Sequence, residues 1–404
     1  MDKCLLITII LYILPFPSLA YDFEMDGIYY NILSENTVEI TNGTSNYQGN
    51  VRIPSSVTID QKTYKVTSIG TDAFYGCNDL TSVTIPNSVN YIGRRAFRES
   101  KNLASINIPD KVTSIGVNAF YGCTGLKTVH ISDLLAWLKI SFDDVYANPC
   151  DNAHGLYLNG EKLTVLKIPN EVTEIKNYAF YGCSSLESII IPNGVTTIGK
   201  RTFQGCEGIS SIVLPNSMKE IGEYAFFYCR GLSSVTIGNS VVSIGEKAFS
   251  NCTSLVSLSI PNSVSSIGDG VFSGCSSLSS ITIPNSVTRI GAYAFNGCSK
   301  LSAVHINDLS SWLKISIGYL GNPCEYAHRL FLNGKELTEI TIPDDITVLK
   351  DNVFYGCSDL ISVNIPTHVT SIGNSSFYKC EGLKSVILPN SVSNIGEWAF
   401  GYCI

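Results

Sequence analysis

Apolar residues recur along this chain with a period of 23. The phrase Ile-Pro-Asn-Ser-Val, followed three residues later by Ile-Gly, returns with small changes over most of its length. Pro86 and Pro109 are 23 residues apart, and so are five further pairs of prolines between Pro169 and Pro389. A fixed period in the twenties predicts one supersecondary unit stacked on copies of itself, so the chain is expected to form a solenoid.

Residues 86–108 serve as the example of one unit. The Pro-Asn-Ser sequence signals a turn, and Val89 and Ile92 are expected to point inward from a short strand. Phe97 follows in a tight turn or a single helical turn. Residues 103–108 then show the L-x-x-I-x-I spacing of a leucine-rich-repeat strand. The unit is therefore predicted to be mainly β.

A phenylalanine stands at the position of Phe97 in twelve units, from Phe74 to Phe400. We expect these rings to line a continuous ladder inside the solenoid, each contributing about 1.5–3 kcal/mol through burial. One unit alone buries too little to offset an ordering cost of about 1–2 kcal/mol per residue, so stability must come from stacking.

Two segments break the period, and both are predicted to be expanded coils rather than separate domains. They cover residues 132–168 and 307–342, share the pattern Asn-Pro-Cys and Leu-Asn-Gly, and belong to a block duplicated about 175 residues apart. The predicted organisation is a right-handed solenoid of about fourteen coils over 51–404, twelve short and two long. A β cap over 21–50 precedes it, with a hairpin between Tyr29 and Ile40.

Eleven cysteines share one position in the repeat, just after the phenylalanine. Equivalent side chains in stacked coils point the same way rather than at each other, so we interpret them as small buried residues and not as disulfides. Ser100 fills the same position in one coil, which agrees with a packed site. The pattern Cys-x-x-x-His at Cys150 and Cys324 could hold two metal ligands, but no further ligands accompany it, and no metal site is predicted.

The complete pattern, Ile-Pro-x-x-Val-x-x-Ile-Gly-x-x-Ala-Phe-x-x-Cys-x-x-Leu, resembles the BspA-like class of leucine-rich repeats from about Val51 to Ile404. Departures are few: Lys176 and Lys350 replace the glycine, and Thr202 and three other residues replace the alanine. The resemblance implies a protein exported to a cell surface that binds other cells or matrix proteins. It supplies no catalytic residues to carry over.

Composition and the N-terminus agree with that expectation. Charged residues make up 15% of the chain and the formal net charge is −7, which argues against nucleic-acid binding. Residues 1–20 are interpreted as a signal peptide cleaved near Ala20, giving a secreted or cell-surface protein. No later segment has the run of about 18 apolar residues that a transmembrane helix needs. No hydrolase motif, phosphate loop or cofactor signature is found, and no enzymatic activity is predicted.

The expected partner is a protein or glycan on host matrix or on other cells. The long coils concentrate aromatic and histidine side chains, whereas the short coils offer mainly Ser and Thr, so partner contact is assigned to the long coils. The six candidate binding residues are Tyr146, His154, Tyr157, Tyr319, Tyr326 and His328. The two tryptophans, Trp137 and Trp312, are interpreted as filling the widened core.

Two alternatives stay open. The first is a passive structural spacer or coat, favoured by a monotonous stripe of outward serines on the strands; the second is an enzyme on an unusual scaffold. An open edge after Cys403 also leads to one of two expectations, self-association through the C-terminus or a natural sequence that continues beyond Ile404.

Overall fold

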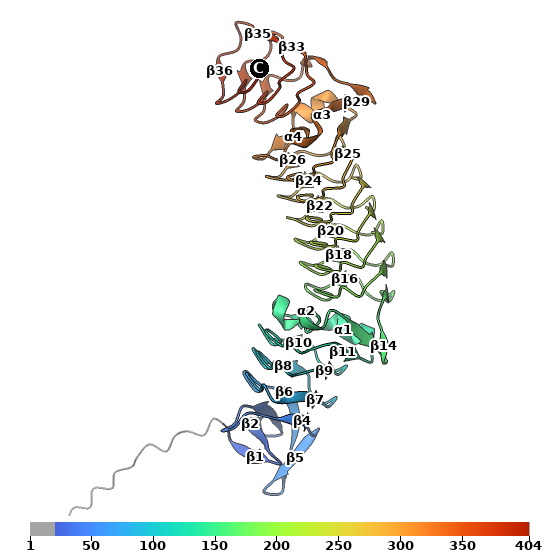
Figure 1. The fold of residues 1–404 in the computed structure, drawn as a ribbon, viewed down its shortest axis with the longest axis vertical. Coiled ribbons are helices and arrows are strands. Elements are labelled where there is room, and N and C mark those ends of the chain that lie inside the picture. The colour runs from blue at the N-terminus through green and yellow to red at the C-terminus, as the bar shows by residue number, and fades with distance from the viewer. Residues whose placement is uncertain (1–20, 404) are drawn as a thin grey trace, which may run out of the picture.

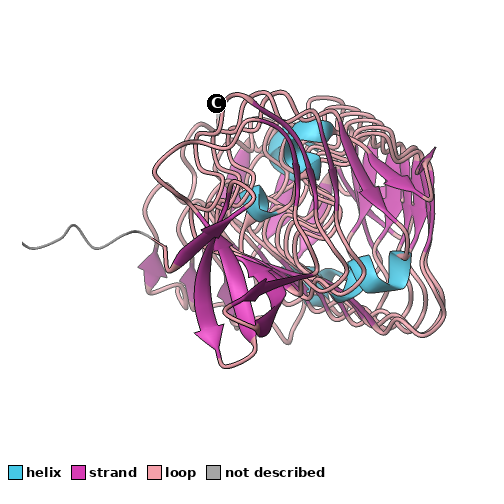
Figure 2. Ribbon diagram, turned by 90° about the horizontal axis from the view of Figure 1, so that it is seen from below, coloured by secondary structure: helices cyan, strands magenta, loops and turns pink. Residues whose placement is uncertain are grey.

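The computed structural model describes residues 21–403, and these form one elongated, gently curved stack of coils (Figure 1). The signal peptide expected over 1–20 lies outside the described residues. Each regular coil contributes two short strands that pair in parallel with the same strands of neighbouring coils. Viewed along the stack, the loops of successive coils overlie one another (Figure 2). The predicted β-solenoid of about fourteen coils is confirmed.

The strands form two rows along the stack. The long-strand row contains β4 (Gly49–Arg52), β7 (Leu80–Thr84), β9 (Ser105–Asn107), β11 (Thr128–Ile131), β13 (Leu156–Leu158), β15 (Val165–Lys167), β17 (Ser188–Ile190), β19 (Ser211–Val213), β21 (Ser234–Thr236), β23 (Ser257–Ser259), β25 (Ser280–Thr282), β27 (Ala303–Ile306), β29 (Leu330–Leu332), β31 (Glu339–Thr341), β33 (Ser362–Asn364) and β35 (Ser385–Ile387). The short-strand row contains β6 (Lys62–Ile69), β8 (Tyr91–Ile92), β10 (Ser114–Ile115), β12 (Ser141–Phe142), β16 (Glu174–Ile175), β18 (Thr197–Ile198), β20 (Glu220–Ile221), β22 (Ser243–Ile244), β24 (Ser266–Ile267), β26 (Arg289–Ile290), β28 (Ser316–Ile317), β32 (Val348–Leu349), β34 (Ser371–Ile372) and β36 (Asn394–Ile395).

The core lies between the two rows and consists of columns of equivalent side chains. Val89, Ile92 and Phe97 are fully buried, as the sequence predicted. The phenylalanine rings stack face to face at centroid distances of about 5 to 6 Å, for example 5.3 Å between Phe226 and Phe249. The predicted ladder is not continuous, however. Stacked pairs form three runs, over residues 74–120, 180–295 and 354–400, because each long coil interrupts the column.

The N-terminal end is built from antiparallel strands. β1 (Phe23–Met25), β2 (Ile28–Ser34) and β3 (Thr37–Thr41) extend the short-strand row, and the β2–β3 pairing is the hairpin expected from the sequence. β5 (Ser56–Ile59) pairs antiparallel with β6. The first coil therefore carries an inserted hairpin and is not one of twelve short coils, which corrects the predicted count. The division into a cap over 21–50 and a solenoid beyond it stays a prediction.

The two long coils share a common structure. The first contains α1 (Leu134–Lys139), η1 (Val145–Ala147), α2 (Cys150–Ala153) and a β13–β14 hairpin, where β14 spans Glu161–Lys162. The second contains α3 (Leu309–Leu313), α4 (Cys324–Ala327) and a β29–β30 hairpin, where β30 spans Lys335–Glu336. Figure 1 shows α1 and α2 in green and α3 and α4 in orange, at two levels of one uninterrupted stack.

The glycine that ends each short strand is required by close stacking. A Cβ on Gly222 would lie 2.6–2.7 Å from backbone atoms of Gly199 and Ile198 in the previous coil. The two lysines that replace this glycine, Lys176 and Lys350, both follow a long coil. The Lys176 ammonium donates a hydrogen bond to the Lys139 carbonyl at the end of α1, 2.5 Å away, and Lys350 does the same at Lys314. These departures therefore fasten the long coils to the next regular one.

Candidate binding surface

One edge of the solenoid is made of tight turns that connect each short strand to the cysteine column; residues 93–100 are an example. We call this surface the turn edge. The residue before the column alanine has positive φ in all twelve of these turns, from Asp72 at 59° to Trp398 at 58°. That backbone conformation is uncommon for side chains larger than Asn, yet seven of the twelve positions hold Tyr, Trp, Arg or Lys. The hydrophobic pattern of the sequence does not predict this feature.

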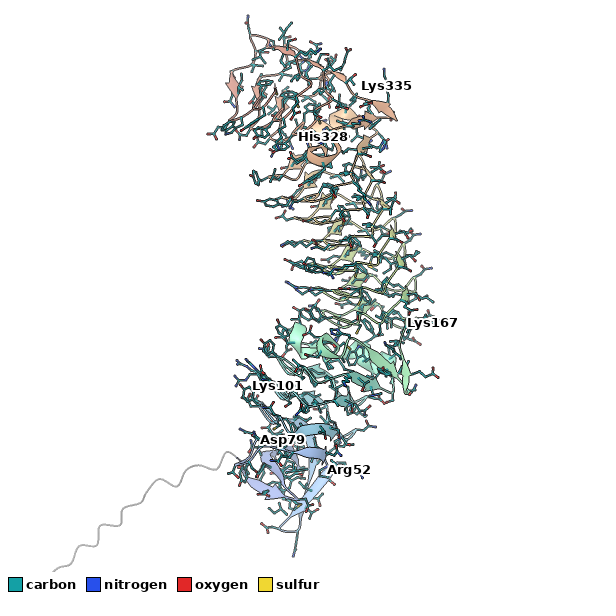
Figure 3. All side chains as sticks on the ribbon, viewed as in Figure 1. Arg52, Asp79, Lys101, Lys167, His328 and Lys335 are labelled. Carbon is teal, nitrogen blue, oxygen red and sulfur yellow. The ribbon has the colours of Figure 1, made fainter. Side chains whose placement is uncertain are left out.

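Aromatic and cationic side chains gather on the turn edge, both at the positive-φ position and at the residue that follows the column phenylalanine. Near the N-terminus, Arg98 lies over the Tyr121 ring, 5.0 Å from its centroid, and over Tyr75 at 6.0 Å. Tyr75 and Tyr121 are exposed. Figure 3 shows side chains extending in regular rows from successive coils. Such cation–aromatic contacts hold exposed rings in fixed orientations.

The middle coils carry the densest cluster. The Arg201 guanidinium lies 4.1 Å from the Tyr224 ring centroid, and the Lys247 ammonium donates to the Tyr224 hydroxyl at 3.1 Å. Glu246 accepts from Lys247 at 3.1 Å. The hydrogen bonds that Lys247 donates to Tyr224 and Glu246 raise its pKa above the ordinary value, so the ammonium stays charged. Glu246 offsets the charge of the lysine, and Arg201 leaves the cluster with one net positive charge.

The C-terminal coils repeat the arrangement with different residues. The Lys379 ammonium pairs with Glu325 at 2.9 Å, an interaction that raises its pKa, and lies 5.9 Å from the Tyr378 centroid. Tyr378 contacts Tyr402 edge-on at 5.2 Å, and Trp398 is 65% exposed. Exposed aromatics therefore occur along the whole turn edge.

Tyr146 and Tyr319, two of the predicted site residues, lie on this edge. Tyr146 packs edge-on against Tyr121 at 4.8 Å, and Tyr319 packs edge-on against Tyr293 at 5.6 Å. Both tyrosines are exposed, Tyr319 to 64%. They do not occupy equivalent positions, because Tyr146 is the second residue before its Asn-Pro pair and Tyr319 is the third before its own.

His154 and His328 do occupy equivalent positions, and both have a local structural role. Each ends a short helix in the left-handed conformation, with φ of 56° and 61°. The backbone N–H of His154 donates to the Cys150 carbonyl at 2.8 Å, and that of His328 to Cys324 at 2.9 Å. Both imidazoles are exposed. His154 borders a shallow depression of about 370 Å³ that Asp151 and Tyr181 also line.

Tyr157 and Tyr326 occupy different surfaces. Tyr157 stands on β13 in the long-strand row, where its ring is 5.1 Å from His130. Its equivalent, Phe331, lies 5.0 Å from His305. Tyr326 is half-buried, and its hydroxyl donates to Asn296 at 2.6 Å. The six predicted residues are thus distributed between the turn edge and the long-strand row.

The tryptophans belong to the core, as interpreted from the sequence. Trp137 and Trp312 are both 1% exposed. The Trp137 Nε1–H donates to the Ala179 carbonyl at 3.0 Å, and the Trp312 Nε1–H donates to Val353 at 3.1 Å. Each ring fills the space that the phenylalanine ladder leaves at a long coil.

The cysteine column is buried except at Cys403, which is half-buried, and within residues 21–403 all thirteen thiols are free. The cysteines of this column also form hydrogen bonds between coils. The Cys229 Sγ–H donates to the Phe203 carbonyl of the previous coil at 3.1 Å, and seven other cysteines repeat this contact over 26 residues. Ser100 makes the same bond to Phe74 at 2.6 Å. Burial raises the pKa of the Cys229 thiol well above its ordinary value.

Two further properties concern only the described part of the chain. Among residues 21–403, no three His, Cys, Asp or Glu side chains gather in a way that could hold a metal ion. No helix in that range is long and apolar enough to cross a membrane.

Stacked 23-residue coils with a leucine-rich-repeat strand define a leucine-rich-repeat solenoid with an exposed turn edge. Comparison with known proteins makes the assignment specific. The BspA type leucine rich repeat region matches in six copies over residues 47–143, 154–243, 219–317 and 324–404. The chain therefore belongs to the BspA-type leucine-rich-repeat family.

Solved structures agree with that assignment. A leucine-rich repeat protein from Bacteroides ovatus is 29% identical, with 95% of this chain and 93% of that chain covered and a TM-score of 0.59. A leucine rich cell surface protein from Faecalibacterium prausnitzii is 26% identical, with coverage of 93% and 94% and a TM-score of 0.50. No curated protein matches. The family consists of surface proteins with interaction or adhesion roles in general, typically on non-enzymatic binding scaffolds.

Proposed function

We propose that the chain is an exported or cell-surface binding protein that contacts a protein or glycan on host matrix or neighbouring cells through its turn edge. The observation that supports this proposal is the row of exposed aromatic side chains at Tyr75, Tyr121, Tyr146, Tyr293, Tyr319 and Trp398. Aromatic side chains dominate the binding energy of most interfaces. Export with cleavage near Ala20 is part of the proposal, and a related surface protein in the comparisons supports it.

Backbone conformation strengthens the argument. A left-handed backbone costs a bulky residue about 1–2 kcal/mol, whereas glycine adopts it freely. Gly270 shows that glycine fits this column, and Asn118 and Asn352 show that asparagine does. A chain that instead places Tyr, Trp or Arg there bears a cost in stability that folding does not require. Unfavourable backbone conformations of this kind concentrate at functional sites.

The test replaces side chains by residues that the same column already contains. Tyr293→Asn should leave the thermal midpoint unchanged or slightly raised, because asparagine suits the left-handed conformation. Tyr224→Asn also removes the contacts of Tyr224 with Arg201 and Lys247, so its backbone gain is offset and no net rise is expected for it or for the double variant. Binding to immobilised fibrous matrix proteins and glycans should weaken about tenfold or more, as for the loss of interface aromatics. Tyr91→Ser is the matched control, since Tyr91 is exposed but lies on the short-strand row.

The predicted site residues are tested in the same assay. Tyr146 and His154, then Tyr319 and His328, then all four are replaced. Progressive weakening supports a role for the long coils. Unchanged binding in the fourfold variant, with weaker binding in the Tyr224 and Tyr293 variants, assigns the contact to the regular turns. Unchanged binding in both sets contradicts the proposal.

A second candidate is a passive spacer or coat, and one observation favours it. The long-strand row presents serines at one outward position, such as Ser211, Ser234 and Ser257, all exposed. A surface of small polar side chains offers few anchors for a partner. Binding to none of the matrix proteins, glycans or cell surfaces tested would favour this function.

A further inference from the structure

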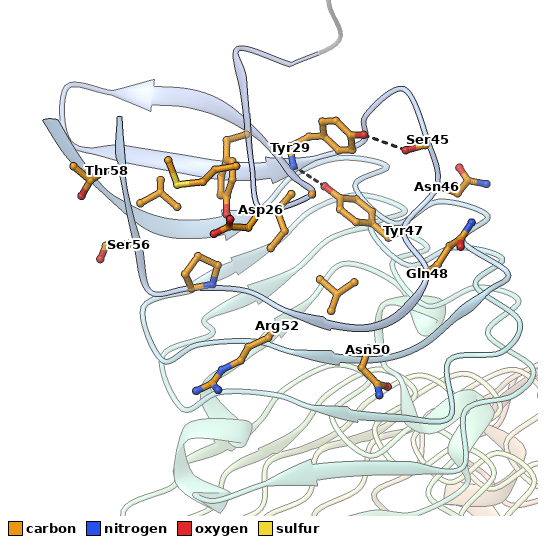
Figure 4. Close-up of a pocket in the computed structure, with 17 residues that line it drawn as sticks. Asp26, Tyr29, Ser45, Asn46, Tyr47, Gln48, Asn50, Arg52, Ser56 and Thr58 are labelled. Carbon is orange, nitrogen blue, oxygen red and sulfur yellow. Dashed lines mark hydrogen bonds between the residues drawn. The ribbon is translucent and has the colours of Figure 1, made fainter. Parts of the chain in front are cut away.

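The N-terminal end of the solenoid contains a cavity of about 750 Å³ that no part of the proposed function uses (Figure 4). It arises because the two strand rows end differently. The short-strand row continues into β3, β2 and β1, whereas the long-strand row stops at β4. The cavity lies beside β4, where the next strand of that row would stand. Strands β1, β2 and β5 contribute the opposite wall through residues 25–30 and 56–58.

The free edge of β4 presents unpaired backbone groups to this cavity. The Ile53 N–H donates to Thr84 at the end of β7, 3.1 Å away. Peptide groups alternate in direction along a strand, so those of Arg52 and Asn50 point away from β7. Within the described residues, β4 pairs with β7 alone. An edge strand of this kind is a template for a further strand.

The lining is suited to an extended peptide. The floor is apolar and includes Ile28 and Val57, which are buried, and the rim carries exposed polar groups such as Gln48 and Arg52. Among the residues that line the cavity, Asp26 carries a negative charge and Arg52 a positive charge, so the two charges balance. A neutral ligand that bonds through its backbone is therefore favoured over a strongly charged one.

One polar group that lines the cavity has no hydrogen-bond partner within the described residues. Tyr30 is 1% exposed and lines the cavity, and no hydrogen bond to its hydroxyl is found within residues 21–403. The neighbouring Tyr29 and Tyr47 differ, since the Tyr47 hydroxyl accepts from the Tyr29 N–H at 3.0 Å and donates to Thr41 at 2.7 Å. Burial and the nearby Asp26 carboxylate raise the pKa of Tyr30 to about 12, so its hydroxyl keeps its proton. A protonated hydroxyl without a protein partner can donate a hydrogen bond to a ligand in the cavity.

We propose that this cavity binds an extended, uncharged peptide segment of a partner protein, which adds to β4 as the next strand of the long-strand row. The Arg52 and Asn50 peptide groups supply the main-chain hydrogen bonds, and the Tyr30 hydroxyl donates to the bound segment. Alternate side chains of the peptide face the apolar floor. This mode of recognition gives affinity through the backbone and selectivity through alternate side chains.

The probe is a labelled peptide Leu-Thr-Ser-Val-Thr-Ile-Pro, a copy of residues 80–86 that already pair with β4 from its other side. Binding is measured by fluorescence anisotropy with the chain beginning at Tyr21, which retains every described element. Two N-methylated peptides, modified at odd or at even positions, remove alternate N–H donors. One should lose binding and the other should retain it, because only one set of N–H groups can face β4.

Arg52→Pro tests the protein side. Proline removes an N–H that points away from β7, so the existing pairing remains, and proline is tolerated at such edge positions. Affinity should fall about tenfold, the effect of one main-chain hydrogen bond, while the thermal midpoint stays unchanged. Arg52→Ala is the matched control and should bind within about threefold of the parent chain, since it keeps the N–H. Tyr30→Phe should weaken binding to a similar degree as the proline variant.

Three results would overturn the proposal. The first is equal binding of both N-methylated peptides, which needs no variant protein and therefore holds even if Arg52→Pro fails to fold. The second is failure of the probe, and of an array of uncharged seven-residue peptides with alternating apolar residues, to bind the parent chain. The third is concentration-dependent dimerisation that Arg52→Pro abolishes, which would assign the edge of β4 to a second copy of the chain.

Discussion

Replacing cysteines of the central column by serine and by alanine separates hydrogen bonding from packing. Cys229 is fully buried, and its Sγ lies 3.1 Å from the Phe203 carbonyl. Alanine removes the sulfur, which costs about 0.8 kcal/mol of burial, and a weak hydrogen bond worth about 0.5–1 kcal/mol. The Phe203 carbonyl still accepts from the Cys206 N–H at 3.1 Å, so no orphaned acceptor adds to the loss. The expected cost of Cys229→Ala is therefore about 1–2 kcal/mol.

Serine should cost less than alanine, although it is more polar than cysteine. Ser100 already occupies this column, and its Oγ lies 2.6 Å from the Phe74 carbonyl. The hydroxyl is therefore buried with a partner, and we expect Cys229→Ser to remain within about 1 kcal/mol of the parent chain. Triple replacement of Cys206, Cys229 and Cys252 enlarges the difference. The alanine triple should lose about 3–6 kcal/mol if the sites are additive, and the serine triple clearly less.

The assay is urea unfolding followed by circular dichroism in the presence of a reductant. An unchanged dependence on urea concentration would show that the variants expose the same surface on unfolding, so that midpoints can be compared. The decisive comparison is the order of the two triple variants. If the serine triple is as unstable as the alanine triple, or less stable, the inter-coil hydrogen bond contributes nothing and the column requires only an apolar group.

Three further predictions follow from the same packing. Burial raises the pKa of Cys229 and Cys252 above the ordinary value of 9.0, so the unfolded chain loses these protons at a lower pH than the folded chain does. The thermal midpoint should therefore be constant below about pH 9 and fall as the pH rises above it. The fall should be smaller in the serine triple variant. Trp312→Phe should cost about 1–3 kcal/mol in urea unfolding. The double variant with Asn322→Ala should cost more than the sum of the two single variants. Both side chains donate to the Val353 carbonyl at 3.1 Å, so only the double variant leaves that carbonyl without a donor. An isolated coil, residues 192–214, should show no β signal by circular dichroism, since a single coil cannot bury its apolar side; a native-like spectrum would contradict stacking as the source of stability.

Much of the core could be predicted because stacking imposes repetition. A side chain such as Phe226 packs on Phe203 and Phe249, the equivalent residues of the neighbouring coils. A substitution in one coil therefore alters the packing of the next. Burial and periodicity therefore agree along the sequence. The interruptions of the ladder were not predicted, because the fate of the phenylalanine column at a long coil depends on where Trp137 inserts. The hairpin in the first coil is a related case, because the phenylalanine period does not reflect the longer distance from Pro54 to Gly70.

The turn edge could not be predicted from hydrophobic pattern. The residue before the column alanine is chemically diverse, and Asp72, Tyr178, Lys247 and Gly270 all occupy it. These positions share a positive φ, and that backbone angle does not require any particular side-chain polarity. A signal was nevertheless present, since none of the twelve residues is β-branched. Val, Ile and Thr tolerate positive φ worst, so their complete absence from one column of a β protein indicates the left-handed conformation.

The structure also changes how the duplicated long coils are understood. Two equivalent patches on one chain would suit a repetitive partner, because linked sites bind with avidity. Yet the surface residue that both long coils keep on the turn edge, His154 or His328, ends a helix through its backbone, which is reason enough for its recurrence. The exposed tyrosines differ in position between the two coils, and Tyr157 corresponds to Phe331. Selection for a repeated binding site would have preserved these side chains rather than the helix ends. The duplication is therefore explained by folding, and contact along the continuous turn edge is better supported than two discrete sites.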